Sequence, residues 1–179
     1  MKCPDEILDI VNECDEVVGR ASRREIHQRR LLHRAVHVLL FDERNRIFIQ
    51  KRSAAKDTFP LCYDSSASGH LHSGEDYDDC AVRELREELG LEIRRDQLTE
   101  RFKIGACPET GWEFVRVYNV RGDFSPVIDT AEIIEGASWQ VDAAHRLVVE
   151  YPKQCAPSFC RVFLEFDARG LFPSAASKF

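Results

Sequence analysis

Hydrophobic residues in this chain occur in short apolar or alternating runs that are separated by polar turns. Runs of this length, rich in Val, Ile and Phe, predict β-strands. The predicted strands are 7–11, 17–18, 35–41, 46–52, 102–106, 113–120 and 133–141. The first two runs flank a polar segment and predict an N-terminal hairpin. The runs 35–41 and 46–52 predict a second hairpin.

The clearest helix is predicted at residues 77–89. At 100° per residue, four apolar side chains fall on one face that would pack on a sheet: Ala81, Val82, Leu85 and Leu89. Asp76 is a suitable N-cap and Gly90 a suitable end. Other helical segments are 22–30, where Ser22 and Glu25 have the spacing of a capping box, 142–149 and 158–168.

Strands and helices interleave without a regular βαβ repeat, which favours an α/β fold with a mixed β-sheet between helices. With 179 residues, the chain is long enough for one domain with a small appendage. We therefore predict an N-terminal extension over 1–30 (a β-hairpin plus a short helix), a main domain over 31–172 and a tail over 173–179.

Composition narrows the class of protein. Charged residues make up 31% of the chain, and the longest apolar run falls well short of the ~20 residues that a membrane span needs. A net charge of −6 disfavours a nucleic-acid-binding module. The seven cysteines are scattered without a CxxC pair, which disfavours a zinc ribbon or a disulfide framework. The start of the chain has no apolar signal-peptide core, so a cytoplasmic protein is expected. The final Ser177-Lys178-Phe179 only approximates a peroxisomal tripeptide.

Three glutamates share one patch of the predicted helix. Glu84, Glu87 and Glu88 are related by three and four positions, and like charges at this spacing destabilise a helix unless a cation offsets them. Mg²⁺ or Mn²⁺ prefers such oxygen ligands. The alternative from these residues alone is a solvated acidic face in which Arg83 pairs with Glu87.

The segment 69–91, GHLHSGEDYDDCAVRELREELGL, resembles the signature of the Nudix hydrolases. The matching residues are Gly69, Glu75, Arg83, Glu84, Leu85, Glu87, Glu88, Gly90 and Leu91. The resemblance implies the Nudix fold, a mixed β-sheet sandwiched between α-helices. It also implies metal-dependent hydrolysis of a nucleoside diphosphate linked to another moiety, so the expected partner is a small-molecule diphosphate.

The resemblance also implies roles for single residues. Glu84, Glu87 and Glu88 would bind Mg²⁺ or Mn²⁺, with the carbonyl of Gly69 as a further ligand. Glu84 is in addition the candidate general base. Glu75 and Arg83 would form a structural ion pair that holds the loop to the helix, which Gly90 ends.

Outside this segment, Arg52 and Lys56 are candidates for binding phosphate oxygens, and Glu132 is a candidate for another metal ligand or a base. The alternatives are a solvated basic strand end and a surface acid. The hairpin extension could form a dimer contact or a lid. Trp112, Phe114 and Phe59 could stack on a base or pack in the core.

Residues 50–60 resemble a Nudix subgroup related to isopentenyl-diphosphate isomerase. In those isomerases histidines and glutamates bind a metal, and His33 and His70 match two of those ligands. Glu113 resembles the catalytic glutamate, but Ser68 replaces the catalytic cysteine, and Gly111 is nearest a missing glutamate.

The other four histidines (His27, His37, His72 and His145) have no such match and are expected to take surface or core roles. Three functions remain open: a hydrolase, an isomerase-like enzyme and a non-catalytic nucleotide-binding module.

Overall fold

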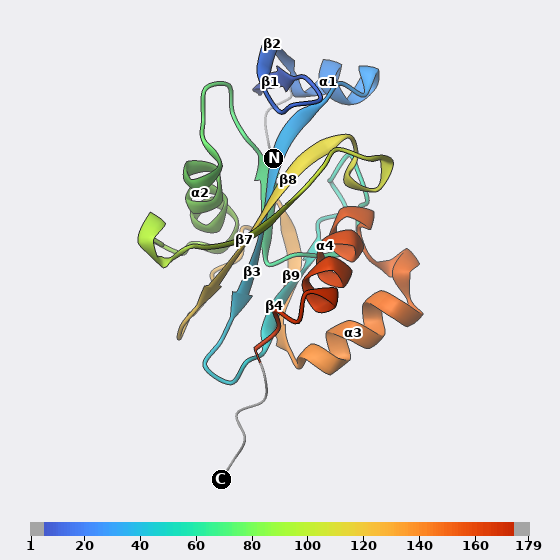
Figure 1. Ribbon diagram of the computed structural model, residues 1–179. Coiled ribbons are helices and arrows are strands. Elements are labelled where there is room, and N and C mark those ends of the chain that lie inside the picture. Colours follow the sequence, from blue (N-terminus) through green and yellow to red (C-terminus); the bar gives the residue numbers. More distant parts are fainter. Residues whose placement is uncertain (1–5, 174–179) are drawn as a thin grey trace.

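The computed structural model describes residues 6–173 (Figure 1). In this part of the chain, nine strands form a two-stranded and a seven-stranded sheet. The strands are β1 (Ile7–Val11), β2 (Val17–Ser22), β3 (His33–Phe41), β4 (Ile47–Arg52), β5 (Tyr63–Asp64), β6 (Ala67–His70), β7 (Thr99–Ile104), β8 (Glu113–Arg121) and β9 (Ile133–Trp139). The α-helices are α1 (Arg23–Arg29), α2 (Tyr77–Leu89), α3 (Val141–Glu150) and α4 (Pro157–Ala168).

The large sheet is mixed, as the sequence predicts. Its path runs β5-β4-β3-β8-β7, with β6 also paired to β3 and β9 to β4. Among the strands of residues 6–173, only β3 and β8 pair in parallel, and their register sets His33 opposite Glu113. The second predicted hairpin forms, but β4 meets β3 only at Ile47 opposite Phe41 and takes β9 as its main partner. Beyond that pair, β3 is bonded to β6 instead.

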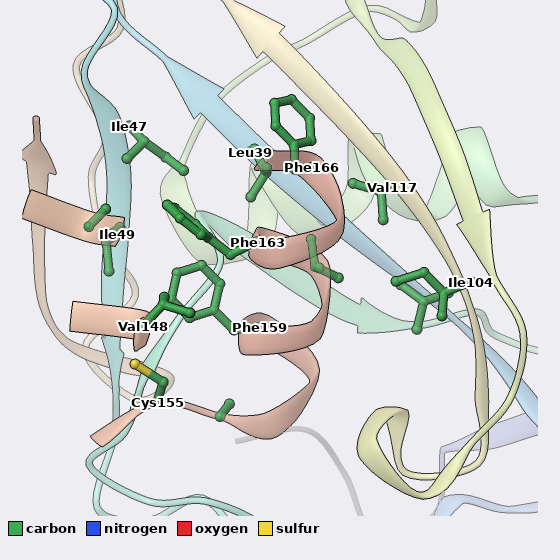
Figure 2. Packing of buried hydrophobic residues seen from close by; sticks show 14 of the residues in the cluster. Leu39, Ile47, Ile49, Ile104, Val117, Val148, Cys155, Phe159, Phe163 and Phe166 are labelled. Carbon is green, nitrogen blue, oxygen red and sulfur yellow. The ribbon is translucent and has the colours of Figure 1, made fainter. Parts of the chain in front are cut away.

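Helices cover both faces of the large sheet, with α2 on one side and α3 and α4 on the other (Figure 1). Each side has its own hydrophobic core. Phe159, Phe163 and Phe166 of α4 pack on Leu39 and Ile49 in the first core (Figure 2). Leu85 of α2 belongs to the second core, and its side chain is fully buried. Because β4 lies between these layers, both of its faces are buried over residues 47–50.

The N-terminal extension packs against the main sheet. Its apolar side chains Leu8, Val11 and Ile26 are buried. The Asp15 carboxylate at the hairpin turn accepts from Arg34 at 2.6 Å and from the Tyr77 hydroxyl at 3.0 Å. These contacts hold the hairpin and α1 at the end of the sheet where β3 begins (Figure 1).

Local signals placed the helices accurately. The Ser22 hydroxyl accepts from the Glu25 amide at 3.2 Å and caps α1, as expected. In α2, the Asp76 carboxylate accepts from the Asp79 amide at 2.8 Å, and Gly90 ends the helix at φ 63°.

The buried face of α2 differs from the prediction in one respect. It is rotated toward Glu84 and Glu88, so Val82 is only half-buried while Cys80 is fully buried. Among residues 6–173, no helix combines the length and the apolar character that crossing a membrane requires.

Candidate active site

The three α2 glutamates differ in exposure. Glu84 and Glu88 face the sheet and are 0% and 2% exposed, whereas Glu87, one turn from Glu84, is exposed. Burying an ionised carboxylate is unfavourable unless charged or polar groups compensate it. Two such carboxylates on one helix therefore require cations or hydrogen-bond donors close by.

Glu88 is compensated by groups from the sheet and from the β4–β5 loop. Its Oε2 accepts from Gln50 Nε2 at 3.0 Å and from the Ser68 amide at 3.2 Å. The Lys56 ammonium lies 4.0 Å from its Oε1. Gln50, which the sequence analysis did not single out, is buried and holds this carboxylate from β4.

Arg83 connects the loop before α2 to the helix. Its Nε and Nη2 donate to the two oxygens of Glu75 at 2.9 and 2.8 Å, and Nη2 also donates to the His70 carbonyl at 2.9 Å. Its Nη1 donates to Glu84 at 2.6 Å and to Glu87 at 3.1 Å. Burial would raise the pKa of Glu75, but the Arg83 hydrogen bonds outweigh it and lower that pKa.

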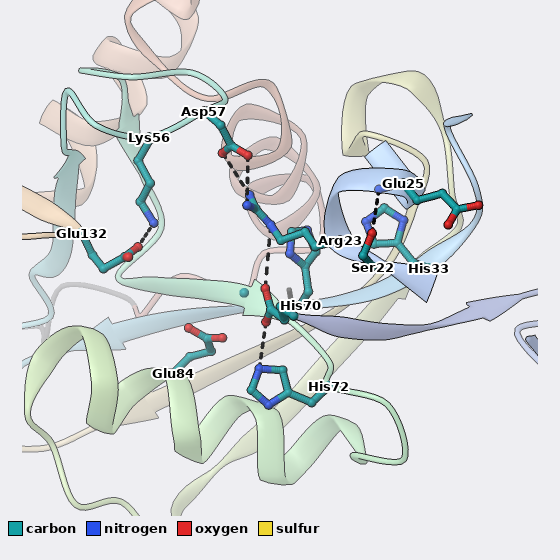
Figure 3. A network of polar contacts seen from close by, with 12 residues as sticks. Ser22, Arg23, Glu25, His33, Lys56, Asp57, His70, His72, Glu84 and Glu132 are labelled. Carbon is teal, nitrogen blue, oxygen red and sulfur yellow. Dashed lines mark hydrogen bonds and ion pairs between the residues drawn. The ribbon is translucent and has the colours of Figure 1, made fainter. Parts of the chain in front are cut away.

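Lys56 and Glu132 come together although their predicted roles were separate. The Lys56 ammonium forms an ion pair with the Glu132 carboxylate, which is 6% exposed (Figure 3). Arg52 lies nearby, and its Nη1 donates to Asp64 at 2.8 Å while Nη2 donates to the Thr58 carbonyl at 3.0 Å.

Gly69 lies on β6, opposite Val36 of β3, and its carbonyl oxygen is 3.8 Å from the Cys80 sulfur on α2. This places the Gly69 carbonyl against the helix that carries the glutamates. The backbone of β6 thus contributes on the same side as Glu88, which accepts from Ser68.

A second cluster of ligand-type groups forms where α1 meets the sheet. His27, His33, His70 and Glu113 each place one ligand atom within 4.8 Å of all the others. Glu113 Oε1 is 3.0 Å from His70 Nε2 and 3.5 Å from His33 Nε2. The Nε2 atoms of His27 and His33 are buried, and within residues 6–173 neither makes a hydrogen bond of good geometry, although His33 Nε2 approaches Glu113. Imidazole-rich sets of this kind suit transition metals such as Fe²⁺ or Zn²⁺ better than Mg²⁺.

Burial favours the neutral form of two histidines in this cluster, His27 and His70. It lowers the pKa of His70 to about 3, against the opposing influence of Glu113. Burial also lowers the pKa of His27, with Arg23 adding to the effect. For Glu113, burial would raise the pKa, but His33 and His70 hold it far below its usual value. Neutral imidazoles beside an ionised carboxylate are the forms that bind metal ions.

A cavity of about 690 Å³ extends from His27, His70 and Glu113 of the second cluster to the β4–β5 loop. The α2 glutamates do not line it, but Glu88 contacts two residues that do, Lys56 and Ser68. Both candidate phosphate-binding side chains, Arg52 and Lys56, line it, and Phe59 and Trp112 line it as well. The other lining residues are Arg23, His27, Arg30, Ala35, Val36, His37, Thr58, Asp64, Ser68, Gly69, His70, Pro108, Glu109, Thr110, Gly111, Glu113, Ala156 and Ser158.

His27 was missed by the sequence analysis, which expected a surface or core role. It lies on α1, six residues before His33, and reaches the cluster only because α1 folds back beside β3. A helix with a histidine shortly before a buried strand that starts with another histidine is the signal that could have found it. The other unmatched histidines behave as expected. His37 is buried and its Nδ1 is 2.6 Å from the Ser65 hydroxyl, His72 is exposed, and His145 is half-buried.

Comparison with known proteins agrees with this architecture. The model of the NUDIX domain matches residues 31–153. An uncharacterized Nudix hydrolase of Streptomyces coelicolor is 40% identical over 131 residues, which cover 72% of each chain. An isopentenyl-diphosphate delta-isomerase of Photorhabdus laumondii is 31% identical over 131 residues, covering 72% of this chain and 74% of that protein.

Solved structures show the same fold. The crystal structure of a Deinococcus radiodurans protein superposes with a TM-score of 0.77 at 30% identity, covering 89% of this chain and 98% of that one. The NUDIX domain of Shewanella oneidensis NrtR, solved with ADP ribose, gives a TM-score of 0.61 at 13% identity, covering 77% and 88% of the chains. The chain belongs to the Nudix family.

The α2 residues fit the divalent cation that the family implies. Glu84 and Glu88 are buried carboxylates, and the side chains that now offset them are cationic, Arg83 and Lys56. The candidate metal ligands are all oxygen atoms, namely the carboxylates of the α2 glutamates and the carbonyl of Gly69. Such a set matches Mg²⁺ or Mn²⁺, whereas the histidine-rich second cluster does not share this preference.

Proposed function

We propose that this protein is a Mg²⁺- or Mn²⁺-dependent diphosphohydrolase. The observation that carries the proposal is the pair of buried carboxylates, Glu84 and Glu88, of which Glu88 contacts Lys56 and Ser68 in the wall of a cavity that Arg52 also lines. Anionic groups alone would repel a diphosphate and cationic groups alone would only bind it. The combination suits a phosphate substrate that arrives with a metal ion.

In this proposal Glu84, Glu87, Glu88 and the Gly69 carbonyl hold the cation, and Glu132 adds a carboxylate on the other side of Lys56. A bound divalent cation offsets the charge of the diphosphate and makes water a better nucleophile. Arg52 and Lys56 bind phosphate oxygens. Arg83 and Glu75 fix the loop before α2 and take no part in the chemistry.

Glu84 is the candidate general base. Its carboxylate is buried, and the Arg83 guanidinium, 2.6 Å away, orients it. A base must lie within hydrogen-bond reach of the proton that it accepts, so the attacking water must approach the α2 side of the cavity. Since that side holds Gly69 and Ser68, the scissile diphosphate would lie along β6.

The substrate that we propose is a nucleoside diphosphate linked to another moiety. The NrtR domain with the same fold binds ADP ribose, and the cavity here has room for a ligand of the usual size, because binding pockets range over about 300–1,000 Å³. We place the reaction in the cytoplasm. The exposed Val17 and Val18 of β2 could contact a second copy of the chain in a homodimer.

The test is product release from a panel of nucleoside triphosphates, nucleotide sugars and dinucleotides, with Mg²⁺, with Mn²⁺ and with a chelator. Cation-dependent cleavage at a diphosphate is expected. Glu88→Gln should remove it, whereas the matched control Glu92→Gln changes an exposed glutamate just beyond α2 and should keep it. Cleavage that persists in chelator, or in Glu88→Gln, would contradict the proposal.

An isomerase-like activity is the second candidate, because His33, His70 and Glu113 do form the cluster that the resemblance to isopentenyl-diphosphate isomerases indicated. Against it, Ser68 stands where those enzymes have cysteine, and a hydroxyl is a poor proton-transfer group near neutral pH. Cys62 directly precedes β5 and is not among the residues that line the cavity. We therefore propose hydrolysis, with the second cluster as an additional candidate metal-binding set.

A further inference from the structure

Two cysteines meet at the start of α4. The N-cap of this helix is Ala156 and its first residue is Pro157, so Cys155 directly precedes the cap and Cys160 is the fourth helical residue. Side chains at these two positions commonly pack together across the first turn of a helix. Here they are two thiols: Cys155 belongs to the hydrophobic core under α4, and Cys160 packs against the same core.

The two thiols have different surroundings. Cys155 is 3% exposed and belongs to the core under α4, whereas Cys160 is only partly buried. Cys160 also lies in the first turn of the helix, where free backbone N–H groups favour a thiolate.

The ionisation of the pair follows these surroundings. Interaction with Cys155 lowers the pKa of the Cys160 thiol against the opposing effects of burial and Asp64, and the same interaction, together with burial, raises the pKa of Cys155. Cys160 is thus the accessible nucleophile of the pair, and Cys155 is a protected thiol in contact with it.

We propose that Cys155 and Cys160 form a redox modification site that hydroperoxides oxidise to a disulfide. The Cys160 thiolate attacks one peroxide oxygen, the O–O bond breaks, and the thiol becomes a sulfenic acid with release of water when the oxidant is hydrogen peroxide. The Cys155 thiol then attacks the Cys160 sulfur. The S–S bond forms as the S–O bond breaks, and the hydroxyl of the sulfenic acid leaves with the proton of Cys155 as a second molecule of water. One peroxide is reduced and two thiols are oxidised.

The disulfide would act on the wall of the cavity. Ala156 and Ser158, which lie between the two cysteines, both line the cavity, and the Ala156 amide donates to the Tyr63 carbonyl at 2.9 Å. A covalent link across this turn would fix its backbone against β5. The modification site does not depend on the proposed hydrolase activity, since it needs neither substrate nor metal.

Cys62 is a competing partner. It precedes Tyr63, which is bridged to Cys155, and Cys160 lies close enough to contribute to the raised pKa of the Cys62 thiol, which burial mainly causes. Cys160 lies about one helical turn from Cys155, which favours a disulfide between these two residues. A disulfide between Cys62 and Cys160 would remove the same number of free thiols, so a thiol assay would not distinguish the two. The test must therefore locate the bond.

Digestion with trypsin locates the disulfide, because trypsin cleaves after Lys153 and Arg161 and leaves both cysteines on one short peptide, 154–161. The folded protein is treated with hydrogen peroxide, alkylated, digested and measured by mass spectrometry. We expect this peptide to lose two hydrogens and both alkyl groups, and to regain them after dithiothreitol. The dose should be about tenfold lower than the dose that modifies the exposed Cys14. A doubly alkylated peptide at that dose, or a cross-link to the peptide that holds Cys62, would overturn the proposal.

Single substitutions test the order of the steps. In Cys155→Ser, Cys160 should stop at the sulfenic acid and be trapped by dimedone. In Cys160→Ser, Cys155 should stay reduced at the same dose. Cys107→Ser, a matched control at a half-buried cysteine outside the pair, should still form the disulfide. Rapid oxidation of Cys155 in Cys160→Ser would show that the assigned nucleophile is wrong.

Discussion

Lys56 and Glu132, 76 residues apart in the chain, form an ion pair at the edge of the cavity (Figure 3), and the same ammonium lies 4.0 Å from Glu88. One cation thus serves two carboxylates that the family resemblance assigns to metal binding. The Lys56 ammonium thus lies beside the two carboxylates, Glu88 and Glu132, that would also attract a divalent cation. The pair therefore links the stability of the protein to its proposed cofactor.

Lys56→Met should destabilise the protein in the presence of a chelator. Both charges of the pair are largely buried, and removing one partner of such a pair leaves the other uncompensated, at a cost of about 3 kcal/mol. Mg²⁺ should restore part of the loss. Thermal unfolding with and without Mg²⁺ measures this effect, and Lys51→Met on β4 is the control. An equal response to Mg²⁺ in Lys56→Met and the parent protein would show that Glu88 and Glu132 do not share a cation site.

Replacing single α2 glutamates should abolish turnover without unfolding the protein. Glu88→Gln keeps an oxygen that can accept from Gln50 and Ser68 but removes a charged ligand. We expect kcat to fall at least ~10²-fold, as when a main electrostatic stabiliser is removed. The melting temperature should stay the same or rise, because repulsion from Glu84 is relieved. Near-normal turnover of Glu88→Gln on a cleaved substrate would rule out the assignment.

Arg83→Ala should lower both stability and activity. The guanidinium holds Glu75, the His70 carbonyl and two α2 glutamates, so its loss strands buried carboxylates at a cost of a few kcal/mol. The matched control is Arg86→Ala on the exposed face of the same helix. Differential scanning calorimetry of both variants checks the result, and an unchanged melting curve for Arg83→Ala would instead support a direct catalytic role.

Glu75 should make stability depend on acid pH. Its pKa is lowered in the folded protein from an ordinary value of 4.5, because the Arg83 hydrogen bonds outweigh burial. The stabilisation is therefore present above pH 4.5 and is lost as the pH falls through the folded-state pKa. Urea unfolding as a function of pH should show a shallower acid loss in Glu75→Gln than in the parent protein. Parallel curves would mean that the pair does not stabilise the fold.

No conversion of isopentenyl diphosphate to dimethylallyl diphosphate is expected. Ser68 cannot replace a cysteine in proton transfer near neutral pH, and Glu113 alone supplies one of the two groups that the migration needs. The measurement is incubation with labelled isopentenyl diphosphate and Mg²⁺, Mn²⁺ or Zn²⁺, followed by assay for acid-labile product. Product at enzymatic rates would move the active centre to His33, His70 and Glu113.

The sequence alone determined the features that depend on neighbours along the chain. The limits of α2 follow from the Asp76 cap and from Gly90, and the hairpins follow from polar turns between apolar runs, because these signals act within a few residues. The spacing of Glu84, Glu87 and Glu88 likewise fixes that they share one helix. The Nudix resemblance added the fold, which helix periodicity could not supply.

The tertiary structure decided which residues meet across the sheet. The parallel pairing of β3 with β8 sets His33 opposite Glu113, and the return of α1 brings His27 to the same point. Burial of both faces of β4 turns Gln50 into a partner of Glu88, 38 residues away. No local pattern encodes these contacts, because they depend on strand order and on which face of each element is covered, and these are settled only when the whole core packs.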